Sequence, residues 1–191
     1  MEYKIHDKKI IRRKKYEEKK HYSEYKNILV EDFHGMCGYC GKNREHLLDE
    51  YQIDHFAPKS KFEDLENKYT NLVLACPNCN RLKSNKWIGD DKNTPNNGEK
   101  GFVDPATDEY NNHLARDING NIIWKTNVGK YMYDVFKFEI RPTRLFFKLN
   151  KLIKLKEILS QDESEEGIRK FREIQLYIDA LQKLLKYQKK E

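Results

Sequence analysis

The chain has 191 residues, of which 38% are hydrophobic and 36% are charged, and its formal net charge is +6. This length suits one modest domain with an appendage. The sequence has no run of about 18 apolar residues, so we expect no membrane-spanning helix. The N-terminus does not resemble a secretory signal, so we expect a soluble, cytoplasmic protein in a reducing compartment.

Positive charge is concentrated at the two ends of the chain. Residues 1–20 hold nine Lys and Arg against four Asp and Glu, and residues 141–191 hold thirteen against eight. These ends either bind nucleic acid through their positive charge or are solvent-exposed flanks without a partner. Apolar residues at helical spacing predict a helix from Tyr16 to Phe33, so residues 1–34 are expected to be a basic segment with this helix.

The next feature along the chain is the spacing of its cysteines, and this is the most specific pattern in the sequence. All four cysteines fall into two C-x-x-C pairs, Cys37 with Cys40 and Cys76 with Cys79. Two such pairs supply the ligands of a tetrahedral, structural Zn²⁺ site, and two disulfides are the alternative. The pairs stand 35 residues apart, whereas a zinc ribbon separates them by about 15–20 residues. We therefore expect a functional insert between them.

The insert has the pattern of two strands joined by a polar connection. Residues 51–55 are expected to form the first strand, and residues 72–75, which are all apolar, the second. A helix should follow from Asn80. Strand, strand and helix would then be held together by the zinc ion.

Five polar residues in and after the insert match a known family. They stand in the segments DHFAPKS and NLVLACPNCNRLKSNK, and they are Asp54, His55, Asn71, Asn80 and Lys83. With the cysteine pairs they resemble the HNH endonucleases, which have a ββα-metal core. Asn80 stands where other members carry histidine, but active members, including RNA-guided Cas effectors, also carry asparagine there. The resemblance implies hydrolysis of nucleic-acid phosphodiester bonds, with DNA favoured.

Phosphodiester hydrolysis needs a base for water and a cation for the phosphate. His55, with an ordinary pKa near 6.5, is the candidate base. Asp54 should point to the opposite face of its strand unless the strand bends, and the resemblance implies that it bends and that Asp54 and Asn80 hold Mg²⁺ or Mn²⁺. Lys83 shares a helical face with Asn80 and is expected to hold a phosphate oxygen. By resemblance, Asn71 braces the loop that carries His55 through hydrogen bonds to backbone.

The remaining segments are expected to be additions to this core. The core is expected over residues 35–90, and residues 91–142 to be a loop and β-hairpin extension, with an Asn-Gly turn in a hairpin near residues 113–126. Residues 143–191 show two helical periodicities and predict a C-terminal helical hairpin that packs on the core, docks a partner or pairs with a second copy. The predicted class is therefore α+β: a zinc-stapled ββα-metal core with an N-terminal helix, a β-hairpin and a helical hairpin.

The layout is similar to that of small bacterial HNH effectors of anti-phage systems of the Septu and retron types, in which an ATPase is the partner, and of stand-alone restriction nucleases. No G-x-x-x-x-G-K-[ST] segment is present, so nucleotide sensing would come from another protein. Two alternatives remain: a zinc-ribbon module that binds nucleic acid or protein, and a nuclease that is silent until a partner ATPase activates it.

Overall fold

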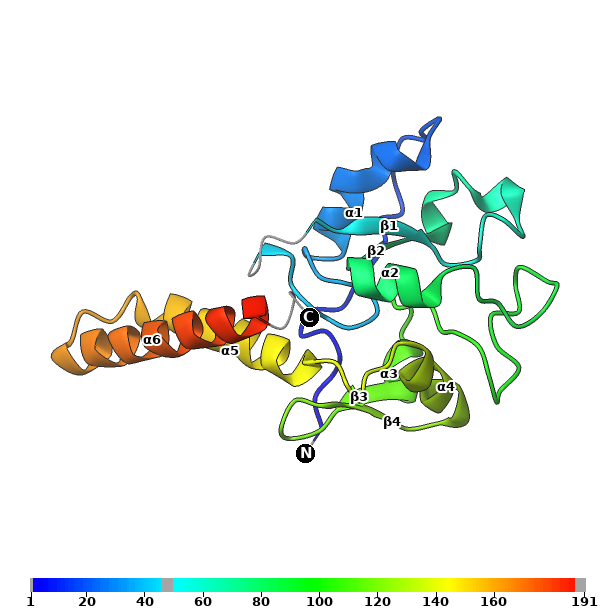
Figure 1. Cartoon of the computed structure of the whole chain (residues 1–191). Helices are drawn as coiled ribbons and strands as arrows, with labels where there is room; N and C mark the ends of the chain where they lie inside the picture. Colours follow the sequence, from blue (N-terminus) through cyan, green and yellow to red (C-terminus); the bar gives the residue numbers. More distant parts are fainter. Residues whose placement is uncertain (1, 46–49, 188–191) are drawn as a thin grey trace.

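Residues 2–45 and 50–187 are described by the computed structural model, whereas residues 1, 46–49 and 188–191, which include the end of the basic C-terminal tail, lie outside the described residues. A body of short helices and strands carries a long two-helix arm (Figure 1). Helices and two small antiparallel sheets make up the fold. The predicted α+β class is confirmed.

Two strands and a helix form the centre of the body. β1 (Gln52–His55) pairs antiparallel with β2 (Leu72–Ala75), and His55 stands opposite Leu72. α2 (Pro77–Lys83) follows β2 after one residue. The sequence pattern predicted a start at Asn80, which is three residues too late. The helix begins at Pro77 because proline suits the first position of a helix, where the N–H that it lacks would have no partner within the helix. Cys79 and Asn80 therefore both lie on α2.

The N-terminal helix is shorter than the sequence predicted. A 3-10 helix (Tyr22–Tyr25) leads into α1 (Lys26–Asp32), which packs against β2. The expected start at Tyr16 is wrong, because His21 caps the first turn: its backbone N–H donates to the Glu24 carboxylate at 2.9 Å. Such a cap stabilises a helix beginning directly after it.

Two arginines of the basic N-terminal segment are used inside the fold. The Arg12 guanidinium donates to the Leu72 carbonyl at 3.0 and 3.1 Å and pairs with Asp104 at 2.7 Å. Arg13 pairs with Asp32 at 2.7 Å. These side chains hold the segment on the body, so the full count of basic residues overstates the positive charge that this end exposes.

Residues 91–142 contain the predicted hairpin and two helices that the sequence did not reveal. β3 (Leu114–Arg116) pairs antiparallel with β4 (Ile122–Trp124), which confirms the hairpin. The additional helices are α3 (Tyr110–His113) and α4 (Asn127–Val135). A Cβ atom at Gly129 would lie 2.0 Å from the His113 carbonyl oxygen, so glycine permits the close approach of α4 to α3. That glycine also weakened the helical signal of the sequence.

The C-terminal helical hairpin is confirmed, and it projects from the body as an arm (Figure 1). It consists of α5 (Thr143–Leu159) and α6 (Glu165–Tyr187). Its own apolar cluster is separate from that of the body. The contacts of α5 with the body include the Phe147 ring against Tyr3 at 5.4 Å and the Asn150 amide donating to the Gly41 carbonyl at 3.3 Å. The contacts of α5 with the body reach as far as Lys154, which pairs with Asp7 at 2.6 Å, whereas Ile158 near the end of the helix is 70% exposed.

Across residues 2–45 and 50–187, none of the helices combines the length and the apolar character that spanning a membrane requires.

Candidate metal centre and catalytic site

The four cysteine sulfurs converge inside the body. Their Sγ atoms all lie within 4.8 Å of one another, and the Cys40 and Cys76 sulfurs are 3.9 Å apart. Zn–S bonds of about 2.3 Å would set the sulfurs of a tetrahedron about 3.8 Å apart. All four cysteines are buried and none is in a disulfide. The donor set and its dimensions fit a structural zinc ion.

Local structure explains why the sulfurs meet. The first pair sits in a tight turn in which the Gly41 N–H donates to the Cys37 carbonyl at 2.9 Å, and Gly41 has a φ of +67°. The Gly38 N–H donates to the Leu74 carbonyl at 2.8 Å, so the turn is tied to β2. In the second pair, Cys76 caps α2 and Cys79 lies in its first turn. The helix start therefore presents both thiols to the turn.

Sequence reasoning missed a cation beside this cluster. The Arg141 guanidinium donates to the Cys79 sulfur at 3.3 Å, to the Cys76 sulfur at 3.7 Å and to the Cys40 sulfur at 3.8 Å. Arg141 is 62 positions beyond Cys79, and no spacing rule relates an arginine to a C-x-x-C pair at that distance. Only the fold brings them together.

Asp54 belongs to a buried polar cluster next to the first cysteine pair. Its Oδ2 accepts a hydrogen bond from the Tyr39 hydroxyl at 2.5 Å and lies 3.4 Å from the Lys83 ammonium. Tyr39 stands between the two cysteines of the first pair, so the metal centre and Asp54 are one hydrogen bond apart. Burial raises the pKa of Asp54 and lowers the pKa of Lys83. The positive charge of Lys83 acts against the shift at Asp54, and the negative charge of Asp54 acts against the shift at Lys83.

Lys83 does not face solvent, contrary to the expectation that it meets a phosphate oxygen. It is the last residue of α2, its side chain is 0% exposed, and its ammonium donates to the His55 carbonyl at 2.9 Å. A buried ammonium needs an anion and acceptors, and Asp54 with the end of β1 provides them. In this structure Lys83 holds the strand end in place.

His55 is held in one tautomer by the backbone. Its Nε2 lies 2.8 Å from the Glu66 carbonyl oxygen, which can only accept, so Nε2 carries the proton and Nδ1 has the free lone pair. The ring packs edge-on against Tyr22 at 4.7 Å. Burial lowers the pKa of His55, which keeps the imidazole neutral at pH 7. A neutral imidazole with an unprotonated nitrogen can take a proton from water.

Asn71 makes the backbone contacts that the sequence predicted. Its Oδ1 accepts from the Ala57 N–H at 2.8 Å, and its Nδ2 donates to the Ala57 carbonyl at 2.9 Å and to the Leu65 carbonyl at 3.3 Å. The loop that follows β1 is thereby tied to the start of β2. This bracing keeps the strand end with His55 in position.

Asn80 lies beside β1 on the face that Asp54 shares. Its Nδ2 donates to the Gln52 Oε1 at 2.7 Å, and Gln52 and Asp54, two residues apart on a strand, point to the same side. Pairing with β2 continues through His55, so the alternation of side chains is kept to the end of β1 and the bend expected there is absent. The structure thus joins Asp54 with Lys83, places Asn80 on their side of β1, and gives His55 different neighbours.

Comparison with known proteins assigns this region to a family. Residues 37–86 match the family model for HNH endonuclease. The chain therefore contains an HNH endonuclease domain, which comprises both cysteine pairs, both strands and α2, and the resemblance seen in the motif is confirmed.

Two curated relatives extend the similarity beyond the domain. The chain is 27% identical over 110 residues to the Septu protein PtuB of Bacillus thuringiensis, an alignment that covers 58% of this chain and 39% of that protein. It is 24% identical over 159 residues to the Septu protein PtuB of Bacillus mycoides strain KBAB4, covering 70% and 53%. The chain thus spans less than two thirds of the length of these relatives. No solved structure matches it significantly.

Proposed function

We propose that the protein is a metal-dependent HNH endonuclease that hydrolyses phosphodiester bonds in nucleic acid, with DNA as the favoured substrate. The observation that carries the proposal is the state of His55. Within an HNH domain, the Glu66 carbonyl fixes its Nε2–H and leaves Nδ1 as a base. A base of this kind takes the proton from the attacking water.

Asp54 and Asn80 are the residues that would hold the catalytic cation. A carboxylate and an amide oxygen are hard ligands that suit Mg²⁺ or Mn²⁺. The Tyr39 hydroxyl and the Lys83 ammonium both contact Oδ2 of Asp54, and an oxygen of this carboxylate would bind the ion. The cation, when bound, supplies positive charge at the scissile phosphate and the leaving oxygen.

Lys83 and Asn71 act as positioning residues in this proposal. Lys83 fixes Asp54 through its charge and His55 through the backbone carbonyl. Asn71 fixes the loop after His55. Neither side chain needs to touch the substrate, because both determine where the base and the metal ligand stand.

The similarity to Septu proteins supports a role as an effector in anti-phage defence. In such a role an ATPase partner would supply the sensing of nucleotide. One observation favours a nuclease that is silent until activated: His55 is 8% and Asp54 5% exposed. The two side chains also leave β1 on opposite faces, so a partner would have to bend the strand end as well as open it before both could act on one phosphate. A zinc-ribbon binding module would have no need of the fixed tautomer of His55.

The direct test is cleavage of supercoiled plasmid in Mg²⁺ or Mn²⁺ by the wild type and by His55→Ala, with zinc content matched. Loss of a general base lowers the rate by about 10²–10⁴-fold. His34→Ala is the control, because the His34 Nε2 also lies 3.1 Å from a backbone carbonyl, that of Lys9, but the side chain is exposed. Equal cutting by both variants would overturn the assignment of His55.

A wild type that is inactive alone would be assayed again together with the ATPase partner that the gated nuclease requires. Cleavage that appears with the partner and disappears in His55→Ala supports the gated nuclease. Binding of nucleic acid with no cleavage in either condition, and unchanged in His55→Ala, supports the zinc-ribbon module.

A further inference from the structure

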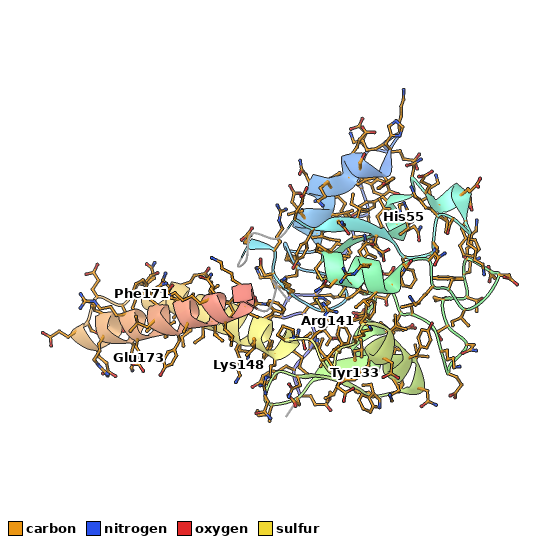
Figure 2. The ribbon with its side chains drawn as sticks, in the orientation of Figure 1. His55, Tyr133, Arg141, Lys148, Phe171 and Glu173 are labelled. Carbon is orange, nitrogen blue, oxygen red and sulfur yellow. The ribbon has the colours of Figure 1, made fainter. Side chains whose placement is uncertain are left out.

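Arg141 is a partly buried cation that the proposed nuclease chemistry does not use. Figure 2 shows it near the centre of the molecule, where the arm leaves the body and well away from His55. Its guanidinium donates to three of the four cysteine sulfurs, at 3.3 to 3.8 Å. In the described part of the chain no carboxylate lies within ion-pair distance of it. The sulfurs are thus the anionic groups available to balance its charge.

The charge of a loaded metal centre explains this arrangement. Four thiolates around one Zn²⁺ carry a net charge of −2, and burial of that charge is unfavourable unless cations or hydrogen-bond donors surround it. A guanidinium provides a positive charge and a planar set of donors that reaches several sulfurs together. Arg141 therefore fits a metal-loaded thiolate cluster better than it fits four neutral thiols.

The position of Arg141 in the chain links the cluster to the arm. Its Nη1 also donates to the Phe136 carbonyl at 3.1 Å, which folds residues 136–141 around the guanidinium. Pro142 and the first residue of α5 follow immediately. A second buried arginine, Arg116, donates to the Cys40 carbonyl at 2.7 Å and to the Thr143 carbonyl at 3.4 Å. Arg116 thereby links the first residue of α5 to the cysteine turn.

We propose that Arg141 is the counter-ion of the metal-loaded cysteine cluster, and that metal binding in the HNH domain thereby fixes the root of the α5–α6 arm to the body. Arg141 is in this view a positioning residue between the two parts. The inference rests on the cysteine cluster and is independent of the nuclease chemistry, so it stands whether or not the protein cuts nucleic acid.

The first test is the rate at which zinc passes from the full-length protein to a chromophoric chelator. Removal of a group that contacts the metal ligands weakens metal binding by about 10–100-fold, so Arg141→Gln should release zinc at least about 10-fold faster than the wild type. Arg144→Gln is the matched control: Arg144 carries the same charge three residues later and is exposed. Its release rate should stay within about twofold of the wild type. A wild-type rate in Arg141→Gln overturns the proposal.

The second test separates the link to the arm from metal affinity alone. Amide hydrogen exchange is measured on zinc-loaded wild type and Arg141→Gln. We expect the variant to lose protection over residues 136–143 while residues 37–41 of the cysteine turn stay protected. Unchanged exchange at residues 136–143 would show that Arg141 does not couple the two parts.

Should Arg141→Gln fail to fold, Arg141→Lys replaces it in both measurements. Lysine keeps the charge but has a single donor group, which cannot reach three sulfurs and a carbonyl together. Zinc release about threefold or more above the wild-type rate, with faster exchange at residues 136–143, supports the proposal. Wild-type release and exchange in Arg141→Lys overturn it.

Discussion

The body and the arm of this protein are stabilised in different ways. The body is held by contacts between residues far apart in the chain: four cysteines from two segments, the Asp54–Lys83 pair and the Arg12–Asp104 pair. The arm is held by two consecutive helices that share a small apolar cluster. The candidate functional residues lie in the first region, where non-local contacts fix side chains more closely than one helix–helix contact does.

The two regions also place different requirements on the amino-acid sequence. An arm whose core comes from helical periodicity needs apolar residues at the right spacing and tolerates many identities at the others. A body built on buried charges and metal ligands depends on particular side chains. Substitutions in the body should therefore have larger effects than matched substitutions in the arm.

The largest expected effect is loss of the metal centre. Cys76→Ser removes one ligand, and structural zinc contributes about 10–16 kcal/mol of binding free energy in zinc-finger peptides. We expect zinc to be lost and the body to lose its fixed tertiary packing. Elemental analysis and near-UV circular dichroism measure the two effects. A variant without zinc that melts like the wild type would contradict the assignment of the four cysteines.

Breaking the buried ion pair should have the next largest effect. Lys83→Met leaves the Asp54 carboxylate buried without its cation, and such a change lowers the free energy of unfolding by about 3–5 kcal/mol. Chemical denaturation measures it. Lys86→Met is the control on the same stretch, since the Lys86 side chain is exposed. Asp54→Asn in the Lys83→Met background should recover part of the loss, and full additivity of the two substitutions would argue against the pairing.

A substitution in the arm should have a smaller effect on stability, and the effect should be confined to the arm. Leu149 is 0% exposed in the cluster between α5 and α6, and Leu149→Ala lowers the free energy of unfolding by about 2–5 kcal/mol. Zinc content should not change. Ile158→Ala, on the exposed end of the same helix, should change stability by less than about 0.5 kcal/mol. Loss of zinc in Leu149→Ala would show that the two regions are less separate than their contacts indicate.

The smallest effect is expected where the N-terminal segment meets α1. Burial raises the pKa of Asp32, but hydrogen bonds from Arg13 and Tyr69 outweigh burial and hold it below its ordinary value. The resulting stability is present above the unfolded pKa and is lost as the pH falls through the folded one, below about pH 4. Asp32→Asn should lower stability at pH 7 by about 1–2 kcal/mol.

Denaturation curves at several pH values check the Asp32 prediction. The difference between Asp32→Asn and the wild type should shrink in acid, because the wild-type carboxyl is then protonated as well. Glu31→Gln is the control, since Glu31 pairs with the same arginine but is exposed. A difference that is independent of pH would mean that the charge of Asp32 is not what stabilises the contact.

The sequence by itself determined the elements whose signals are local or whose chemistry is strict. Two C-x-x-C pairs define a metal ligand set, the apolar run of β2 and the Asn-Gly turn define strands, and helical periodicity defines the arm. The bracing contacts of Asn71 also followed from the motif. These features depend on short-range spacing, which a sequence displays directly.

Tertiary structure alone decided the rest. Lys83 shares a helical spacing with Asn80, yet its ammonium is buried against Asp54 because the last turn of α2 ends beneath β1. Arg141 lies on the cysteine cluster because residues 136–142 fold back onto it. The tautomer of His55 depends on a carbonyl in a different loop. Such pairings arise from contacts between distant segments, and no local pattern in the chain encodes which charge will meet which.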